Sequence, residues 1–114
     1  MHETAIVSSL FEVIQRQIAE HDIPRVIRVN LKIGDFAVVE PMTLRACFEV
    51  FAEGTVVEGA ELVIQRVPIV GRCRRCGHQF EVKNHDFRCL GCANSSVEML
   101  SGKELYIDSL DVEA

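Results

Sequence analysis

Residues 73–92 read CRRCGHQFEVKNHDFRCLGC and contain two CxxC pairs separated by 12 residues. The pairs are Cys73 with Cys76 and Cys89 with Cys92. Each pair forms a tight turn that points two thiolates at one ion, and two such turns close the tetrahedron that Zn²⁺ prefers. The spacing therefore predicts a zinc-binding ribbon, with redox-active cysteine pairs or another metal as the alternatives.

Four cysteines fill the predicted tetrahedron, so no position is left for a substrate or an activated water. We therefore expect a structural site and a protein that is not an enzyme. Gly77 and Gly91 are expected to help the backbone turn beside the cysteines. His78 and His85 lie in the same stretch and are expected to be exposed surface side chains. The alternatives are that either histidine replaces a thiolate or lies beside the metal.

The charge of residues 68–100 fits a bound cation, because five Lys or Arg and three Asp or Glu give a net charge of +2. Four thiolates and one Zn²⁺ together carry a charge of −2, which the +2 of this segment would balance. The alternative function is a zinc ribbon that binds nucleic acid or a transcription partner through Arg74 and Arg75. The whole chain has a net charge of −5, which argues against nucleic acid as a partner.

The residues before this stretch predict a helix followed by a strand. Apolar residues recur at helical spacing over residues 5–18, and Pro24 ends the helix near His21 or Asp22. Apolar and polar residues then alternate over residues 25–35, which is typical of a half-buried strand. The residues predicted on its buried side are Ile27, Val29, Leu31 and Ile33.

A second helix and two more strands complete the prediction. Pro41 suits the first turn of a helix and Gly54 suits its end. Its apolar stripe consists of Leu44, Cys47, Phe48 and Phe51. Residues 60–68 and 104–112 have the composition of strands. Because Cys47 lies on the apolar stripe, this fifth cysteine is expected to be a buried structural thiol.

These elements predict an α+β (α/β two-layer) fold: a small mixed three-stranded sheet with two helices, and an inserted zinc-ribbon module. The predicted domains are an α/β domain at 1–67, the zinc-binding ribbon at 68–100, and a last strand of the α/β domain at 101–114. No leader and no apolar run of membrane-spanning length are present, so we expect a cytoplasmic protein without membrane contact. In that compartment the cysteines would stay reduced.

The chain begins with Met1, His2 and Glu3, which form a candidate nitrogen ligand set. The terminal amine of Met1, the amide nitrogen of His2 and its imidazole can close adjacent chelate rings in one plane. Square-planar nitrogen sites suit Ni(II) or Cu(II). Glu3 would add negative charge. A frayed terminus without a function is the alternative.

Four motifs occur together in this chain: MHE at the start, KIGDF leading to VEP, GTVVEGAEL, and two CxxC pairs before a C-terminal strand. In this order and spacing the chain resembles the HypA/HybF family of nickel incorporation proteins over essentially its whole length. Next to the first motif the family often has an apolar residue followed by Ser, whereas this chain has Thr4 and Ala5.

The resemblance implies a nickel metallochaperone for maturation of [NiFe] hydrogenase, with urease as a second possible recipient. It implies Ni(II) as cargo at His2, with backbone nitrogens including the Met1 amine and with Glu3, and structural Zn(II) at the four cysteines. The partners that it implies are a HypB-type GTPase, the hydrogenase large subunit and urease accessory proteins. We expect a monomer or a weak homodimer.

Overall fold

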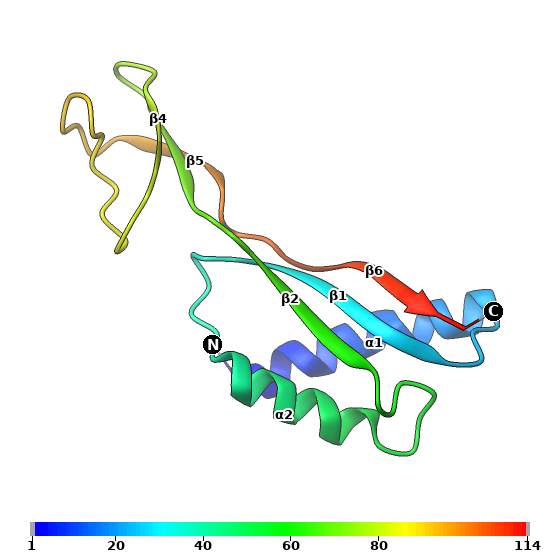
Figure 1. Cartoon of the computed structure of the whole chain (residues 1–114). Coiled ribbons are helices and arrows are strands. Elements are labelled where there is room, and N and C mark those ends of the chain that lie inside the picture. Colours follow the sequence, from blue (N-terminus) through cyan, green and yellow to red (C-terminus); the bar gives the residue numbers. More distant parts are fainter. Residues whose placement is uncertain (1, 114) are drawn as a thin grey trace. The chain divides into compact units, whose positions relative to one another are not determined.

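The computed structural model describes residues 2–113, in which two helices accompany two three-stranded sheets (Figure 1). The elements are α1 (Glu3–His21), β1 (Val26–Gly34), α2 (Pro41–Ala52), β2 (Glu61–Val67), β3 (Val70–Cys73), β4 (Gln79–Glu81), β5 (Val97–Ser101) and β6 (Leu105–Val112). In the part of the chain that the structure describes, no helix is long and apolar enough to cross a bilayer. The predicted fold class is confirmed.

Contacts divide the chain into two compact units. Unit 1 consists of Met1–Leu31, Val38–Gln65 and Tyr106–Ala114, and unit 2 of Lys32–Ala37 and Arg66–Leu105. The predicted division at 1–67, 68–100 and 101–114 stays a prediction.

The first sheet has the strand order β2-β1-β6 and is mixed. Strands β1 and β2 run in the same direction, because Arg28 bonds Glu61 and the Asp35 N–H donates to the Val67 carbonyl. Strand β6 runs the opposite way, because Arg28 also bonds Asp111 while the Gly34 N–H donates to the Glu104 carbonyl. The parallel pair requires a crossover connection, and α2 supplies it.

Both helices cover the same face of the sheet in unit 1 (Figure 1). The Phe11 ring of α1 lies 5.4 Å from the Phe48 ring of α2 and 5.6 Å from the Phe51 ring, measured between centroids. Helix α1 ends at His21 as predicted, with Asp22 in the left-handed conformation at its C-cap. The core of unit 1 is therefore formed by the apolar faces that helical spacing predicts.

One predicted core residue in β1 is wrong. Ile27 is 43% exposed, whereas Val26 and Val29 are both fully buried, so strict alternation begins only after the first two residues of the strand. At the start of the strand the Val26 N–H donates to the carbonyl of Val56, in the loop after α2.

Unit 2 contains the second sheet, with the order β4-β3-β5 and antiparallel pairing throughout. The sequence analysis did not place these three short strands. Their small core is formed by Ile69, Cys73, Phe80, Val82 and Cys89. Two of these five side chains are predicted metal ligands, so the core of unit 2 includes half of the metal centre.

Candidate metal centre

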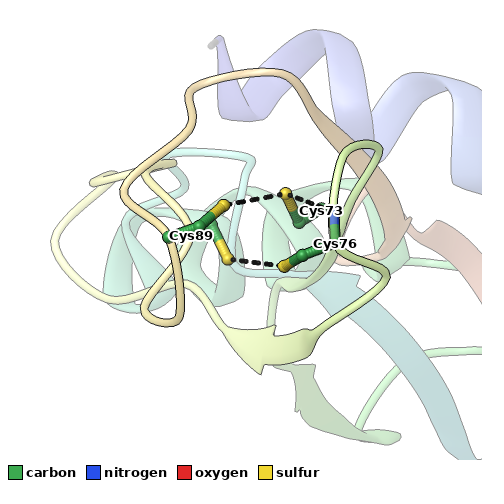
Figure 2. Close-up of side chains that lie close together, drawn as sticks. Cys73, Cys76 and Cys89 are labelled. Carbon is green, nitrogen blue, oxygen red and sulfur yellow. Dashed lines mark hydrogen bonds between the residues drawn. The ribbon is translucent and has the colours of Figure 1, made fainter.

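The structure brings the sulfurs of Cys73, Cys76, Cys89 and Cys92 together, with all four within 4.8 Å of one another. The Cys73 and Cys92 sulfurs are 3.6 Å apart, and those of Cys76 and Cys89 are 3.5 Å apart. A tetrahedron with Zn–S bonds of about 2.3 Å has edges of about 3.8 Å, close to these separations. Figure 2 shows the sulfurs facing a common centre.

The first CxxC pair is shaped by a turn that begins at Cys73. The Gly77 N–H donates to the Cys73 carbonyl over 2.9 Å, and the Cys73 N–H donates to the His78 carbonyl over 2.9 Å. The Cys76 N–H donates to the Cys73 sulfur over 3.4 Å. Gly77 has φ +77°, a left-handed conformation that glycine adopts without strain.

The second CxxC pair repeats this turn with one change of residue. The Ala93 N–H donates to the Cys89 carbonyl over 2.8 Å, and the Cys89 N–H donates to the Asn94 carbonyl over 2.9 Å. Ala93 has φ +61° and so occupies the left-handed position that Gly77 has in the first turn. Gly91 lies within this turn without a positive φ, and its N–H donates to the Cys89 sulfur over 3.3 Å.

The thiols of Cys73 and Cys76 have pKa values that are shifted in opposite directions. Cys73 and Cys89 are buried, and Cys76 and Cys92 are exposed. The N–H of Cys76 is the main group that lowers the pKa of Cys73, to about 6. The His78 N–H lowers the pKa of Cys76, but the Cys89 thiol and desolvation outweigh it and raise that pKa to about 11. Four adjacent thiolates repel one another, and a bound dication removes that repulsion, so metal binding releases protons.

The donor set fits a closed tetrathiolate site. Soft thiolate ligands in a tetrahedral arrangement suit zinc or an iron centre, and backbone N–H groups already hold two of the sulfurs. Among residues 2–113 the four cysteines form the one group of His, Cys, Asp or Glu side chains close enough to share an ion. A bound metal would cross-link the turns of the two CxxC pairs.

The two histidines beside the cysteines are exposed and lie outside the thiolate cluster. The His78 ring stacks on Phe80 with centroids 6.1 Å apart, and the His85 ring lies 6.3 Å from Phe36. Neither side chain contributes to the group of ligands, which agrees with the expectation of surface residues. Their contacts are with aromatic rings of unit 2.

The predicted nitrogen site lies at the start of α1. His2 is the N-cap residue, with φ −82° and ψ 115°, and its side chain is exposed and makes no capping hydrogen bond. Glu3 lies in the first turn and is half-buried. Met1, which would carry the amine, lies outside the described residues. The imidazole of His2 is therefore available to solvent, where a cation could reach it.

The fifth cysteine belongs to neither predicted metal site. Cys47 is half-buried on α2, less covered than predicted, and its sulfur lies 3.5 Å from the Thr4 hydroxyl of α1. It joins the two helices of unit 1. Among the described residues it belongs to no group of three or more His, Cys, Asp or Glu side chains that could share an ion.

Fold and site together define a class: a small α+β protein with an inserted four-cysteine metal-binding module. Comparisons with known proteins identify the family. A family model described as "Hydrogenase/urease nickel incorporation, metallochaperone, hypA" matches residues 1–112. The chain belongs to the HypA family.

Relatives match over nearly the full length. The hydrogenase maturation factor HypA of Desulfitobacterium hafniense is 42% identical over 113 residues, which is 99% of each chain. The hydrogenase maturation factor HybF of Escherichia coli is 37% identical over 99% of this chain and 100% of the relative. The solution structure of the nickel metallochaperone HypA from Helicobacter pylori superposes with a TM-score of 0.70 at 26% identity, covering 100% of this chain and 99% of that chain.

Proposed function

We propose that the chain binds Ni(II) at its N-terminus and delivers it during maturation of [NiFe] hydrogenase. Zn(II) held by the four cysteines stabilises unit 2. The observation that carries the proposal is the match to a nickel-incorporation family over residues 1–112. The exposed His2 at the start of α1 and the four-cysteine cluster supply the two chemically different sites that this function needs.

The start of a helix suits a chelate that uses backbone nitrogen. The first N–H groups of a helix have no acceptor within the helix, so a metal that displaces an amide proton there breaks no helical hydrogen bond. The carbonyl of His2, in contrast, already accepts from Ala5 and Ile6. Nickel would thus be bound by the Met1 amine, the His2 amide and imidazole nitrogens, and Glu3, without unwinding α1.

Nickel bound in this way can be released. The amine competes with a proton at neutral pH, because its ordinary pKa is about 7.7 to 8.0. The helix dipole also disfavours a cation at this end, and Glu3 offsets part of that cost. A carrier needs such moderate affinity, whereas the closed thiolate site retains its metal.

The partners follow from the family. The proposed partners are a HypB-type GTPase and the hydrogenase large subunit, and urease accessory proteins are candidates because the family description includes urease. We place this work in the cytoplasm, where four thiols stay reduced and available for zinc. The chain acts as a carrier and catalyses no reaction.

Nucleic-acid binding through the ribbon is not favoured. The segment that contains the ribbon pairs much of its positive charge internally, since Arg72 bonds Glu98 over 2.7 Å and Arg88 bonds Asp86 over 2.9 Å. Arg74, Arg75 and Lys83 would have to supply the phosphate contacts, and general polyanion binding needs more positive charge than that.

Nickel titration tests the proposed N-terminal site. We expect the intact chain to bind one Ni(II), and expect both His2→Ala and a chain extended by one residue before Met1 to lose that binding. The extension keeps every side chain but moves the amine out of the chelate. His21→Ala, at the other end of the same helix, is the matched control and should bind nickel as the intact chain does.

The delivery step is tested separately in cells that lack their own member of this family. Hydrogenase activity should return with the intact chain and not with His2→Ala. Full nickel binding by both altered N-termini in the titration would contradict the proposed site. Full nickel binding by the intact chain without any return of hydrogenase activity would contradict delivery.

A further inference from the structure

The two units carry opposite charge. Unit 1 contains twelve Asp or Glu and four Lys or Arg, for a net −8, and unit 2 contains five and eight, for a net +3. Of these twelve acidic residues, the proposed nickel site includes only Glu3. An excess of this size attracts partners with positive charge and raises the rate at which they bind.

A groove lies in unit 1 between the C-terminal half of α1 and strand β6, with a volume of about 550 Å³. Its apolar lining includes Val13, Ile23, Leu110 and Val112, and Val13 and Val112 are each 40% exposed. Its polar lining includes Asp22 and Glu113, and no Lys or Arg side chain of the described residues lines it. The groove therefore combines an apolar floor with an acidic rim.

One wall of the groove is an edge strand. Strand β6 ends the order β2-β1-β6, so among the described residues no strand pairs with its second edge. It is eight residues long, enough to pair with an extended peptide. An exposed edge offers a row of backbone N–H and carbonyl groups, and extended peptides bind proteins by adding a strand there.

We propose that this edge and groove bind an extended, basic segment of a partner protein. The segment adds a strand to β6 and places alternate apolar side chains in the groove. Its Lys or Arg side chains lie on the other face of the added strand and at its ends, where the negative charge of unit 1 and the acidic rim attract them. Backbone pairing supplies affinity, and the alternation of apolar and basic residues supplies specificity. This surface is separate from both metal sites and does not depend on the nickel proposal.

A second copy of the chain is a poor occupant of this edge. Pairing β6 with β6 would bring two units together that each carry −8. A basic segment is instead attracted by this net charge, which is why we commit to it.

A synthetic probe tests the proposal directly on the full chain loaded with zinc. The probe is a capped peptide of about ten residues in which valine alternates with lysine, matched to a peptide that alternates valine with glutamate. We expect the lysine peptide to shift the backbone NMR signals of residues 107–113 and to protect their amides from hydrogen exchange. The glutamate peptide should bind at least about tenfold more weakly.

Variants separate the groove from general attraction. Val13→Asp should weaken the lysine peptide by about tenfold or more, whereas Val50→Asp, at a 66% exposed site on α2, should change it less than about twofold. Asp22→Asn with Glu113→Gln should weaken binding several-fold. The same loss of charge through Glu12→Gln with Glu20→Gln, on α1 but outside the groove, should have a smaller effect.

Three outcomes would overturn the proposal. The first is equal binding of the two peptides, and the second is signal shifts that fall outside β6 and the groove. The third is shifts of β6 that follow the concentration of the protein alone, together with a dimer in sedimentation, which would identify a second copy as the occupant.

Discussion

Unit 1 and unit 2 are stabilised in different ways. In the described residues, fourteen hydrophobic side chains are buried in unit 1 and six in unit 2, and two of those six are the predicted metal ligands Cys73 and Cys89. Unit 1 spans 68 residues and unit 2 spans 46. A segment of the smaller size rarely buries enough apolar surface to fold alone and commonly needs a metal or disulfides.

The comparison shows how one chain divides two tasks. Unit 1 has an apolar core without a predicted metal ligand, which leaves its helix start and its acidic surface free for the cargo ion and the partner that we propose. Unit 2 has Cys73 and Cys89 in its core, so the ion that we propose for it would be part of the fold. The predictions below test this division from the largest expected effect to the smallest.

Removal of the zinc should have the largest effect and should be confined to unit 2. A strong chelator, or Cys73→Ser, is expected to unfold unit 2, because structural zinc contributes about 10 kcal/mol or more to such small modules. NMR signals of residues 66–105 should collapse to unfolded positions while the helices of unit 1 stay intact.

Cys47→Ser is the matched control for this experiment, since Cys47 lies in unit 1 and outside the cluster. It should keep one zinc per chain by elemental analysis. A unit 2 that remains folded without metal would show that the ion is not structural.

The converse experiment removes core volume from unit 1. Phe48 is 2% exposed and packs on Phe11, so Phe48→Ala should destabilise unit 1 by about 3–5 kcal/mol. Zinc content and the signals of unit 2 should not change. Thermal unfolding followed by helical circular dichroism measures the loss, and Val50→Ala at an exposed position of α2 should cost less than about 0.5 kcal/mol.

Unit 1 was largely predictable from the sequence, because long elements carry clear periodicity. Helix α1 shows five buried residues at helical spacing, and the turn residue Pro41 marks the start of α2. Ile27 was misplaced because the strand begins with a buried Val26 and alternates only from its third residue; Val26 bonds Val56, 30 residues away in sequence. No local pattern contains that information.

Unit 2 was predictable in its chemistry and less so in its structure. Two CxxC pairs are enough to predict that four sulfurs meet. The strands β3, β4 and β5 are only 4, 3 and 5 residues long, too short for alternation to be recognised. Ala93 gave no signal of a left-handed conformation; only its position four residues after Cys89, where Gly77 follows Cys73, could have shown it.

The two turns of the metal centre provide a matched pair of substitutions with opposite expected signs. A Cβ on Gly77 would meet no atom within 4 Å, so Gly77→Ala should cost only the left-handed strain, about 1 kcal/mol. Ala93→Gly should relieve a similar strain and so stabilise the folded state. The greater freedom of glycine in the unfolded chain should offset about 0.5 kcal/mol of that gain.

The rate at which a chelator removes zinc measures both effects, because the turns must open to release the ion. Gly77→Ala should speed removal and Ala93→Gly should slow it. The same direction of change in both variants would show that the turns are not equivalent.

The smallest predicted effect concerns the start of α2 and depends on pH. The Glu40 carboxylate accepts from the Thr43 N–H over 2.7 Å and from the Thr43 hydroxyl over 2.9 Å. The N–H is the main cause that lowers the pKa of Glu40 below its ordinary value of 4.5. Because the folded state has the lower pKa, the contribution to stability is complete above the ordinary value and is lost as pH falls through the lowered pKa.

Glu40→Gln should therefore lower the thermal midpoint of unit 1 slightly at pH 7, and the difference from the intact chain should shrink below pH 4.5. Helical circular dichroism isolates this effect, because both helices lie in unit 1 and acid also releases zinc from unit 2. Glu49→Gln, exposed on the same helix but outside its first turn, is the matched control for the loss of one carboxylate. A difference for Glu40→Gln that persists unchanged in acid would mean that packing, and not the ionised cap, stabilises the start of α2.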